Sequence, residues 1–590
     1  MKNRQSGVEQ EVKSLTRILD PRSSVFCSVA LVSAIYVLTL CVLERQGFWS
    51  IDNANKFLQV QAITKSNYSD YSIPWSGRTI DPDFEYNPLI PPFSQVKDQK
   101  LFSPFSIVFA TVSSVLFRLF GFSGLYVLPM VCSVLTLAGL ARIVGAIGLK
   151  TSAKHTVVLI AGLCTPIWFY SVTFWEHIVA VCFCIWGVYF YLRFLKSGLA
   201  KQLVMGSILA SLGIYFRDEL YLFCVVLVCG ALAYSPGRRL KIASLGVAGM
   251  IAGVIPLWFF QWAAMGEPFG FHLTSHVFSD AGIAEFIVKK PAVVYNLFLA
   301  ANPKVWVSLA VTAPFVVAFL INRRFSRCAF ILAVPLYSLI AIVSSFFALC
   351  GYFTSPSPIF WMLHSCSLFT AVPVLILSFL RLKDSGDSVA DSALIKWIWI
   401  VALVYAGLYG LTAPHLGSRG IHWGNRLLLV LYPLFAVLAA VNLVQWFKCF
   451  NLSISWRTFA VALVILISFA AQLYSMRLLH KKKNFSYRLS QEIQKRPEQI
   501  VICPVWWAPQ ELFSAFYNKK IFHTKSREHL EQLVMKLRSR GYDKFLLVTK
   551  VAEAKRKLAV AKVDDGGLGY YSLTFFVIKA RDSHQWYFSQ

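Results

Sequence analysis

The sequence predicts a polytopic α-helical membrane protein with about 13 transmembrane helices, a long external first loop and a small C-terminal external α/β domain. Three observations carry this prediction. Of the 590 residues, 57% are hydrophobic and 15% are charged, whereas soluble domains carry about 25% charged residues. Apolar stretches long enough to cross roughly 30 Å of hydrocarbon recur up to residue 475. The remainder of the chain lacks such stretches and alternates short strand-like and helical segments.

Basic residues orient the chain. The first apolar run follows a basic tail, and no small-x-small cleavage site follows Val42, so we expect a retained anchor with its N-terminus in the cytoplasm. Later basic residues fall in alternate loops, as cytoplasmic loops require. These are Lys150 and Lys154; Arg193, Lys196 and Lys201; Arg238, Arg239 and Lys241; Arg323, Arg324 and Arg327; Arg381 and Lys383; and Lys448. Because the net charge of +28 is concentrated there, we expect the lipid bilayer and no nucleic acid as the partner.

The predicted organisation follows from this orientation. Residues 1–24 form a cytoplasmic tail, 25–475 a transmembrane domain with the external loop 44–102, and 476–590 an external domain. Outside the membrane we also expect 175–177, 217–219, 263–304, 351–358 and 413–426. The apolar runs are 25–43, 103–120, 127–147, 156–173, 178–195, 203–216, 219–234, 242–262, 305–321, 329–349, 359–380, 395–412, 427–446 and 458–474.

The runs 103–120 and 127–147 cannot both cross, because only an odd number of crossings connects an external Phe102 to a cytoplasmic Lys150. The first of them opens with Ser-Pro and contains Arg118. We therefore expect this run, or a neighbour, to lie in the interface or to re-enter. Beyond the last run, strand-like segments at 500–503, 545–549 and 571–578 flank a charged helical stretch at 527–540, which predicts the α/β domain.

The loop 44–102 is the most informative region for chemistry. A long loop between spans is unusual and tends to be functional. Asp52 stands just after the first run, before a short surface helix predicted over 53–62. The plain alternative is that Asp52 caps this helix. Glu176 and His177 lie at the outer end of another run, where ionisable residues are costly unless they face a cavity or a partner. The alternative for them is a satisfied interfacial pair.

Cationic residues gather on the same predicted side. Arg217 stands in Arg-Asp-Glu between two runs, either as part of the turn of a helical hairpin or as a phosphate site. A Gly-rich segment holds Arg419, His422 and Arg426, and a guanidinium fork suits phosphate oxygens; a solvated loop is the alternative. His272 and His276 are spaced for one helical face, but they make a weak metal site without further ligands. The sequence contains no phosphate-binding glycine motif in a convincing context, which argues against an ATP-driven pump.

On these residues the chain resembles the GT-C superfamily of integral membrane glycosyltransferases, which includes the protein O-mannosyltransferases and the aminoarabinose transferase. Members carry an acidic residue just after the first transmembrane helix, where this chain has Asp52. A second acidic site at a later external helix end is matched by Glu176, and a late external Arg before a helix with Pro is matched by Arg426 and Pro433. Many relatives have a doubled acidic pair where this chain has Asp52-Asn53, so no cofactor is assigned and a divalent metal stays open.

The resemblance implies inverting transfer of a sugar, hexosyl or pentosyl, from a polyprenyl-phosphate donor to a lipid, glycan or protein acceptor on the external face. Asp52 would be the general base, with Lys56, one helical turn later, keeping it ionised. Glu176 and His177 would orient a substrate. Arg426, with Arg419 and Arg217 as second choices, would neutralise the leaving phosphate. We expect the inner (plasma) membrane of a bacterium.

Two alternatives remain at this stage. Secondary transporters place charges near the bilayer midplane on broken helices and often have repeated halves, whereas the charges here are predicted at outer helix ends. A lipid-binding scaffold without catalysis would predict that substituting Asp52 or Arg426 leaves sugar transfer unaffected.

Overall fold

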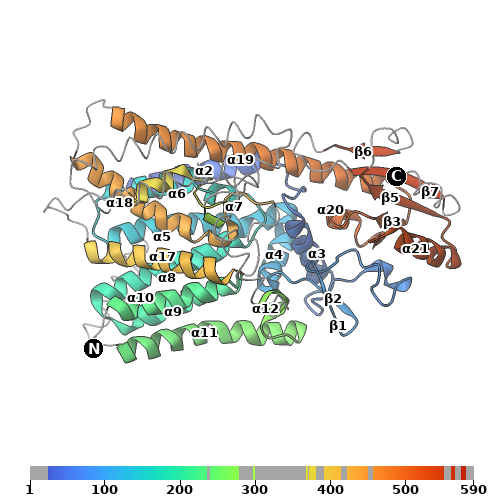
Figure 1. Cartoon of the computed structure of the whole chain (residues 1–590), viewed down its shortest axis with the longest axis horizontal. Helices are drawn as coiled ribbons and strands as arrows, with labels where there is room; N and C mark the ends of the chain where they lie inside the picture. The colour runs from blue at the N-terminus through green and yellow to red at the C-terminus, as the bar shows by residue number, and fades with distance from the viewer. Residues whose placement is uncertain are drawn as a thin grey trace.

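A computed structural model of the chain describes residues 24–234, 239–277, 297–298, 367–369, 371–379, 391–413, 421–449, 456–550, 560–564 and 573–579. Most of the long helices lie side by side along the long axis of the molecule, and a small sheet lies beyond one end of this bundle (Figure 1). The helices of the bundle and the segments between them are α2 (Ser24–Val42), α3 (Ile51–Lys65), η1 (Ser76–Thr79), α4 (Ile107–Phe120), η2 (Gly121–Tyr126), α5 (Val127–Ala146), α6 (Thr151–Leu163), α7 (Ile167–Ser171), α8 (His177–Ser197), α9 (Ala200–Ile214), α10 (Leu220–Tyr234), α11 (Arg239–Met265), α12 (Gly270–Val277), η4 (Pro373–Phe379), α17 (Ser392–Thr412), η5 (Arg426–Leu428), α18 (Leu431–Cys449) and α19 (Trp456–Lys495).

Six of the described helical stretches are long and apolar enough to cross a membrane. They are Val25–Val42, Ile107–Ala146, His177–Ser197, Arg239–Met265, Ser392–Thr412 and Val461–Lys495. Ala200–Ile214, Leu220–Tyr234 and Leu431–Gln445 are shorter apolar helices. The predicted spans 305–321 and 329–349 lie outside the described residues, so a total of about 13 spans remains a prediction.

Two of the apolar runs are not single spanning helices. The run 156–173, expected to cross, is broken into α6 and α7, with Pro166 between them. Proline lacks the N–H that would continue the helix, and it turns the preceding residue away from the helical conformation. The run 103–120 contributes α4, whose 14 residues extend about 21 Å. With η2 and α5 it forms one candidate stretch, Ile107–Ala146, so which of the runs 103–120 and 127–147 spans stays a prediction. Of the run 359–380, the described residues are 367–369 and 371–379, and Pro373–Phe379 form the 3-10 helix η4.

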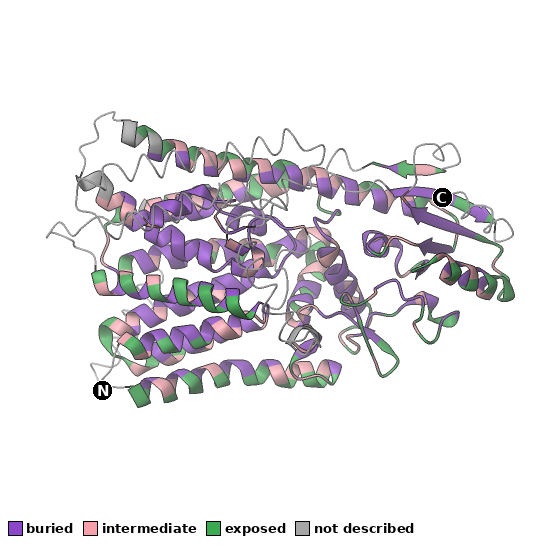
Figure 2. Cartoon of the chain, in the orientation of Figure 1, coloured by how far each residue is buried: buried purple, intermediate pink, exposed green. Residues whose placement is uncertain are grey.

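Burial distinguishes the centre of the bundle from its rim. Helices α5, α8 and α9 pack together, and α8 is buried over most of its surface, whereas α11 shows an exposed face (Figure 2). That face carries large apolar side chains, among them Ile251, Ile255, Phe259 and Trp262. An exposed apolar face on a long helix is the surface that lipid covers in a membrane protein.

The C-terminal part contains a five-stranded sheet in the order β4-β3-β5-β7-β6. Its strands and helices are β3 (Ile500–Cys503), α20 (Ala508–Glu511), η6 (Phe513–Ala515), β4 (Lys520–His523), α21 (Arg527–Ser539), β5 (Lys544–Thr549), β6 (Ala561–Val563) and β7 (Leu573–Lys579). β3 runs parallel to β4 and β5, while β7 pairs antiparallel with β5 and β6. Helix α21 buries one apolar face, as its 3.6-residue periodicity predicts.

The segment between α2 and α4 connects the bundle to this sheet. It contains α3 and the short hairpin of β1 (Gln95–Lys97) and β2 (Lys100–Phe102). The Trp75 indole donates to the carbonyl of Ile521 at 2.9 Å, and the Tyr517 hydroxyl donates to the carbonyl of Leu58 at 2.5 Å. Helix α3 is therefore held between the helical bundle and the sheet (Figure 1).

Candidate functional site

The start of helix α3 fixes Asp52 at the end of the bundle. Ser50 is the N-cap residue, and its backbone N–H donates to Oδ1 of Asn53 at 3.1 Å. Asn53 Nδ2 donates in turn to the carbonyl of Phe174 at 2.7 Å, which ties α3 to the segment preceding α8. Asp52 lies in the first helical turn, where the helix dipole favours a carboxylate. Because Ser50 occupies the cap, the reading of Asp52 as the helix cap is wrong.

Arg426 is the direct partner of Asp52, although 374 residues separate them. Arg426 Nη1 lies 2.6 Å from Asp52 Oδ2, and the two side chains are 18% and 14% exposed. Asn425 holds η5 in place, because its Oδ1 accepts from the backbone N–H groups of Leu427 and Leu428 at 3.1 and 3.3 Å. Gly424 has a φ of +63°, and a Cβ there would lie 2.5 Å from Pro166 Cγ, so the turn before Arg426 requires glycine.

A second set of charges lies beside this pair and is more deeply buried. Lys56 Nζ is 2.8 Å from Glu176 Oε2, and both side chains are 1% exposed. Arg217 bridges two carboxylates: its Nη1 is 3.4 Å from Glu176, and its Nε is 2.9 Å from Glu219. The charge of Lys56 lowers the pKa of Asp52, in the direction that we expected, but the ion-pair partner of Lys56 is Glu176.

Trp175 joins the two sets. The guanidinium carbon of Arg426 lies 5.2 Å from the centre of a Trp175 ring, and Lys56 Nζ lies 5.5 Å from it. Cations over an aromatic face are attracted by its quadrupole, more strongly where water is excluded. Asp52, Lys56, Glu176, Arg217, Glu219 and Arg426 are called the charged cluster from here on. Its three carboxylates balance its three cations.

The charges around Asp52 set its protonation state. Burial raises the pKa of Asp52, but the charges of Arg426 and Lys56 and the hydrogen bond from Arg426 outweigh it, and the net pKa lies below the ordinary carboxyl value. For Lys56, burial lowers the pKa and the carboxylates of Glu176 and Asp52 raise it, with a net value below the ordinary one. Asp52 is therefore ionised at neutral pH.

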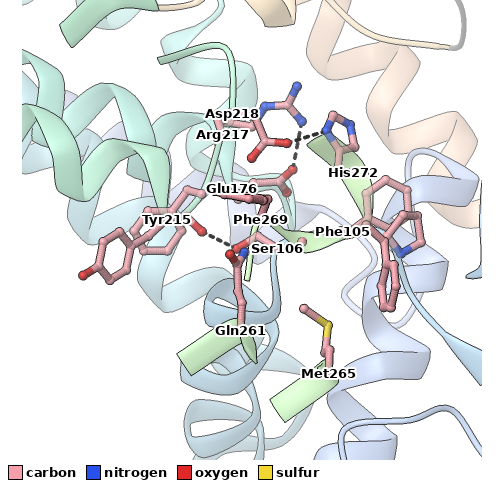
Figure 3. Close-up of a pocket in the computed structure, with 14 residues that line it drawn as sticks. Phe105, Ser106, Glu176, Tyr215, Arg217, Asp218, Gln261, Met265, Phe269 and His272 are labelled. Carbon is pink, nitrogen blue, oxygen red and sulfur yellow. Dashed lines mark hydrogen bonds and ion pairs between the residues drawn. The ribbon is translucent and has the colours of Figure 1, made fainter. Parts of the chain in front are cut away.

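A pocket opens beside the charged cluster. It encloses about 420 Å³, part of it open to solvent, and Glu176 and Arg217 form one wall. Figure 3 shows Asp218 and His272 facing each other at this wall, with His272 Nδ1 2.8 Å from Asp218 Oδ2. The sequence had suggested His272 and His276 as a weak metal site; His272 pairs with Asp218 instead, and the side chain of His276 lies outside the described residues.

The remaining predicted residues are placed as follows. His177 is buried and its Nδ1 lies 3.8 Å from Glu176, beyond hydrogen-bonding range. His422 is fully buried next to Trp423, whose indole donates to Gln472 at 2.9 Å. Arg419 lies outside the described residues. Within the described parts of the chain, no three His, Cys, Asp or Glu side chains gather as metal ligands.

Sequence reasoning missed Glu219 and the Asp218–His272 pair as members of the site. The signal for Glu219 and Asp218 was the triplet Arg-Asp-Glu between two apolar runs, which placed three charges at one helix end. Only Arg217 was selected from it. Nothing in the local sequence of His272 indicates that it faces Asp218, because α12 reaches that position through the fold of α11.

No family model and no curated protein matches the chain. Among solved structures it is similar to ArnT from Cupriavidus metallidurans bound to undecaprenyl phosphate, with 12% identity, a TM-score of 0.43, and coverage of 93% of this chain and 97% of that one. It is also similar to the oligosaccharyltransferase of Archaeoglobus fulgidus, with 11% identity, a TM-score of 0.43, and coverage of 89% and 70%. The archaeal oligosaccharyltransferase AglB from Archaeoglobus fulgidus, in complex with an inhibitory peptide and a dolichol-phosphate, matches with a TM-score of 0.41 and 11% identity over 89% of this chain and 69% of that one. Because identities and TM-scores of this size do not transfer residue roles, the functional proposal below rests on the charged cluster itself.

Proposed function

We propose that the chain is a membrane glycosyltransferase that moves a sugar from a polyprenyl-phosphate donor to a hydroxyl group of a lipid, glycan or protein acceptor, with inversion. The single observation that carries the proposal is the contact between Asp52 and Arg426, at 2.6 Å and partly open to water. A carboxylate that can take a proton and a guanidinium that can hold a phosphate are the two groups that such a transfer needs.

The helix connections support an external position for the charged cluster. Helix α8 begins at the charged cluster and α9 ends next to it, so the α8–α9 turn lies at the opposite end of the bundle. Arg193, Lys196 and Lys201 flank that turn. Since basic residues mark cytoplasmic loops, the charged cluster lies at the external face in our proposal, and the sheet formed by residues 500–579 lies outside with it.

Arg426 has binding capacity to spare. Its Nε is buried and has no hydrogen-bond partner among the described residues. A buried donor without an acceptor costs about 1–3 kcal/mol, so this N–H favours an acceptor beyond those that the described residues supply. Lipid phosphates are named for ArnT and AglB; here that ligand class is proposed from the donors of Arg426, whose fork geometry suits phosphate oxygens.

Binding of the donor phosphate also prepares the base. When the phosphate occupies Arg426, it displaces the carboxylate of Asp52, which loses the charge that most lowers its pKa. Asp52 then becomes a stronger base next to the sugar. The acceptor oxygen attacks the anomeric carbon from the face opposite the phosphate, and the carbon–oxygen bond to phosphate breaks. Its electron pair leaves with the phosphate oxygen, and the acceptor proton passes to Asp52.

The buried charges of the cluster hold α3, α8 and α10 in position around Asp52 and Arg426. Lys56 and Glu176 link α3 to the start of α8, and Arg217 links Glu176 to Glu219. Glu176 also lines the adjacent pocket, and in our proposal it orients the incoming group together with His177. Arg217 is a poorer phosphate ligand than Arg426, because two carboxylates already share its charge.

Purified protein in lipid vesicles tests the proposal with the variants Asp52→Asn and Arg426→Ala. Asp52→Asn removes the base and lowers transfer from polyprenyl-phosphate sugars by about 10²–10⁴-fold. The same variant binds undecaprenyl phosphate more tightly than the wild type, because Asn no longer competes for Arg426. Arg426→Ala weakens that binding at least tenfold.

Asp70→Asn is the matched control, since Asp70 lies in the same loop and pairs with Lys100 at the surface, 41% exposed. It retains both transfer and lipid binding. If Asp52→Asn retains full transfer, Asp52 is not the general base. If both variants retain full transfer, the scaffold alternative is favoured. If Arg426→Ala leaves lipid-phosphate binding unchanged, the donor phosphate does not bind at this site.

A further inference from the structure

Trp175 is the uncharged neighbour of the Asp52–Arg426 pair. Its side chain is fully buried, and the centre of one of its rings lies 5.2 Å from the guanidinium carbon of Arg426. Among the described residues, the ion-pair partner of Arg426 is Asp52 and its aromatic partner is Trp175. When a phosphate takes the place of Asp52, the Trp175 ring is therefore the contact that still holds the guanidinium.

Neighbouring groups fix the position of the Trp175 ring. The centre of the Tyr170 ring from α7 lies 5.6 Å away, and the His177 ring at the start of α8 lies 5.2 Å away, edge to face. The carbonyl of Phe174 accepts from Asn53 Nδ2 at 2.7 Å, which ties the backbone before Trp175 to α3. Aromatic pairs at these separations add to the energy of burial. The indole is therefore a rigid surface for Arg426.

The ring supports Arg426 without competing with an anion. An aromatic face attracts a guanidinium through its quadrupole, but it has no oxygen to accept the guanidinium N–H groups as a carboxylate does. The N–H donors that Asp52 releases are therefore available to phosphate oxygens while the ring keeps the guanidinium in place. A guanidinium that is already in position also avoids the cost of ordering a long side chain on binding.

Lys56 depends less on the same ring. Its Nζ lies 5.5 Å from the centre of the Trp175 ring, but it also lies 4.4 Å from the centre of the Phe105 ring and 2.8 Å from Glu176 Oε2. Without the indole, Lys56 would keep an aromatic contact and its buried counter-charge. Among the described residues, Arg426 has no second aromatic partner to replace Trp175.

We propose that Trp175 is a positioning residue for the transfer, which keeps the Arg426 guanidinium directed at the donor phosphate after Asp52 has released it. Trp175 acts through Arg426 and not on the reacting atoms. The inference rests on the proposed function, since it gives Trp175 a role in the exchange of Asp52 for phosphate. The substrate whose binding depends on this indole is then the lipid-linked donor, and not the acceptor.

Steady-state kinetics of the full chain in lipid vesicles provide the first test. Trp175→Leu removes the aromatic face, and we expect KM for the polyprenyl-phosphate sugar to rise about fivefold, because Arg426 must then be ordered on binding. KM for the acceptor should stay the same, and kcat should change less than the donor KM. Trp175→Phe restores an aromatic face, so its donor KM should return most of the way to the wild-type value. Equal donor KM values in Trp175→Phe and Trp175→Leu would assign the effect to lost packing and overturn the role of the ring.

Trp397→Leu is the matched control for the removal of a buried indole. Trp397 lies in α17, is 1% exposed, and stacks on Tyr191 with ring centres 6.1 Å apart. Tyr191 is about four turns along α8 from the charged cluster, so this variant loses a similar buried surface at a distance from Arg426. We expect its donor KM to match that of the wild type. A donor KM raised as much as in Trp175→Leu would contradict the proposal, because loss of a remote indole would then have the same effect.

Binding of undecaprenyl phosphate to four forms of the full chain separates this inference from the proposed function. The forms are the wild type, Trp175→Leu, Arg426→Ala and the double variant. We expect Trp175→Leu to weaken binding about fivefold in the wild-type background and to have no further effect in the Arg426→Ala background, because the ring acts through the guanidinium. Equal weakening in both backgrounds, or none in either, overturns the positioning role and leaves the proposed function intact. Undiminished binding by Arg426→Ala removes the proposed function, and the role of Trp175 with it.

Discussion

Two ion pairs near the start of α3 have almost the same length and very different surroundings. Asp52 and Arg426 are 2.6 Å apart and 14–18% exposed, whereas Lys482 and Glu511 are 2.7 Å apart and 1% exposed. Both join segments that are distant in the sequence. Lys482 also donates to the carbonyl of Phe48 at 3.4 Å, just before α3 begins, so the sealed pair supports the segment that leads to Asp52.

In our proposal, water access, and not the presence of an ion pair, separates a reactive charge from a structural one. In a buried ion pair each charge has lost its hydration and interacts with a fixed partner. Separating the two leaves an uncompensated buried charge, which costs several kcal/mol. A partly exposed pair can change partners when an anion arrives. By this criterion the Lys56–Glu176 pair belongs with Lys482 and Glu511, and within the charged cluster Asp52 and Arg426 are the groups free to react.

The largest expected effect in this comparison is on stability. Glu511→Gln leaves Lys482 buried without its counter-charge, and we expect a loss of roughly 3–5 kcal/mol of stability, measured as a lower thermal midpoint in detergent. Transfer per folded molecule should fall much less than in Asp52→Asn. The control Asp70→Asn breaks a surface pair and should cost under about 1 kcal/mol. A Glu511→Gln protein as stable as this control would contradict the structural role of the sealed pair.

A smaller effect is expected from shortening the fork of Arg426. Arg426→Lys keeps the positive charge but loses the planar donors, including the unpartnered Nε–H. We expect KM for the lipid-linked donor to rise about tenfold, which corresponds to about 1.4 kcal/mol, while KM for the acceptor stays the same. Equal changes in both KM values would indicate a general distortion of the site instead of lost phosphate contacts.

Much of the helical architecture is local and could be predicted. In lipid a helix must satisfy its own backbone groups, so an apolar run gives its position directly. Thus α2 and α8 coincide with the predicted runs 25–43 and 178–195. The prediction that 156–173 is a single spanning helix was wrong, because it followed hydropathy and gave too little weight to Pro166, which lies between α6 and α7.

The partners within the site are not local and could not be predicted in the same way. Asp52, Glu176 and Arg426 were selected because each is a charge at a helix end. Lys56 stands one turn after Asp52, yet it pairs with Glu176, because the choice depends on where α8 begins in space. The Asp218–His272 contact likewise requires the path of α11, which no pattern around His272 reveals.

The smallest effect is a shift between two pH profiles, and it tests whether the exposed pair changes partners. Arg426, Lys56 and Arg217 all lower the pKa of Asp52 in the free protein, against the effect of burial. A carboxylate base works above its pKa, so the acid limb of kcat/KM, which reports the free protein, should lie below the ordinary carboxyl range. With donor bound, Arg426 faces the phosphate and Asp52 gains an anionic neighbour, so its pKa rises. The acid limb of kcat, which reports the complex, should therefore lie at higher pH than that of kcat/KM. In Arg426→Ala the acid limbs of kcat and kcat/KM should lie closer together, because Asp52 has no Arg426 contact to lose when the donor binds. If the two limbs already coincide in the wild type, Asp52 keeps its contact with Arg426 throughout the reaction.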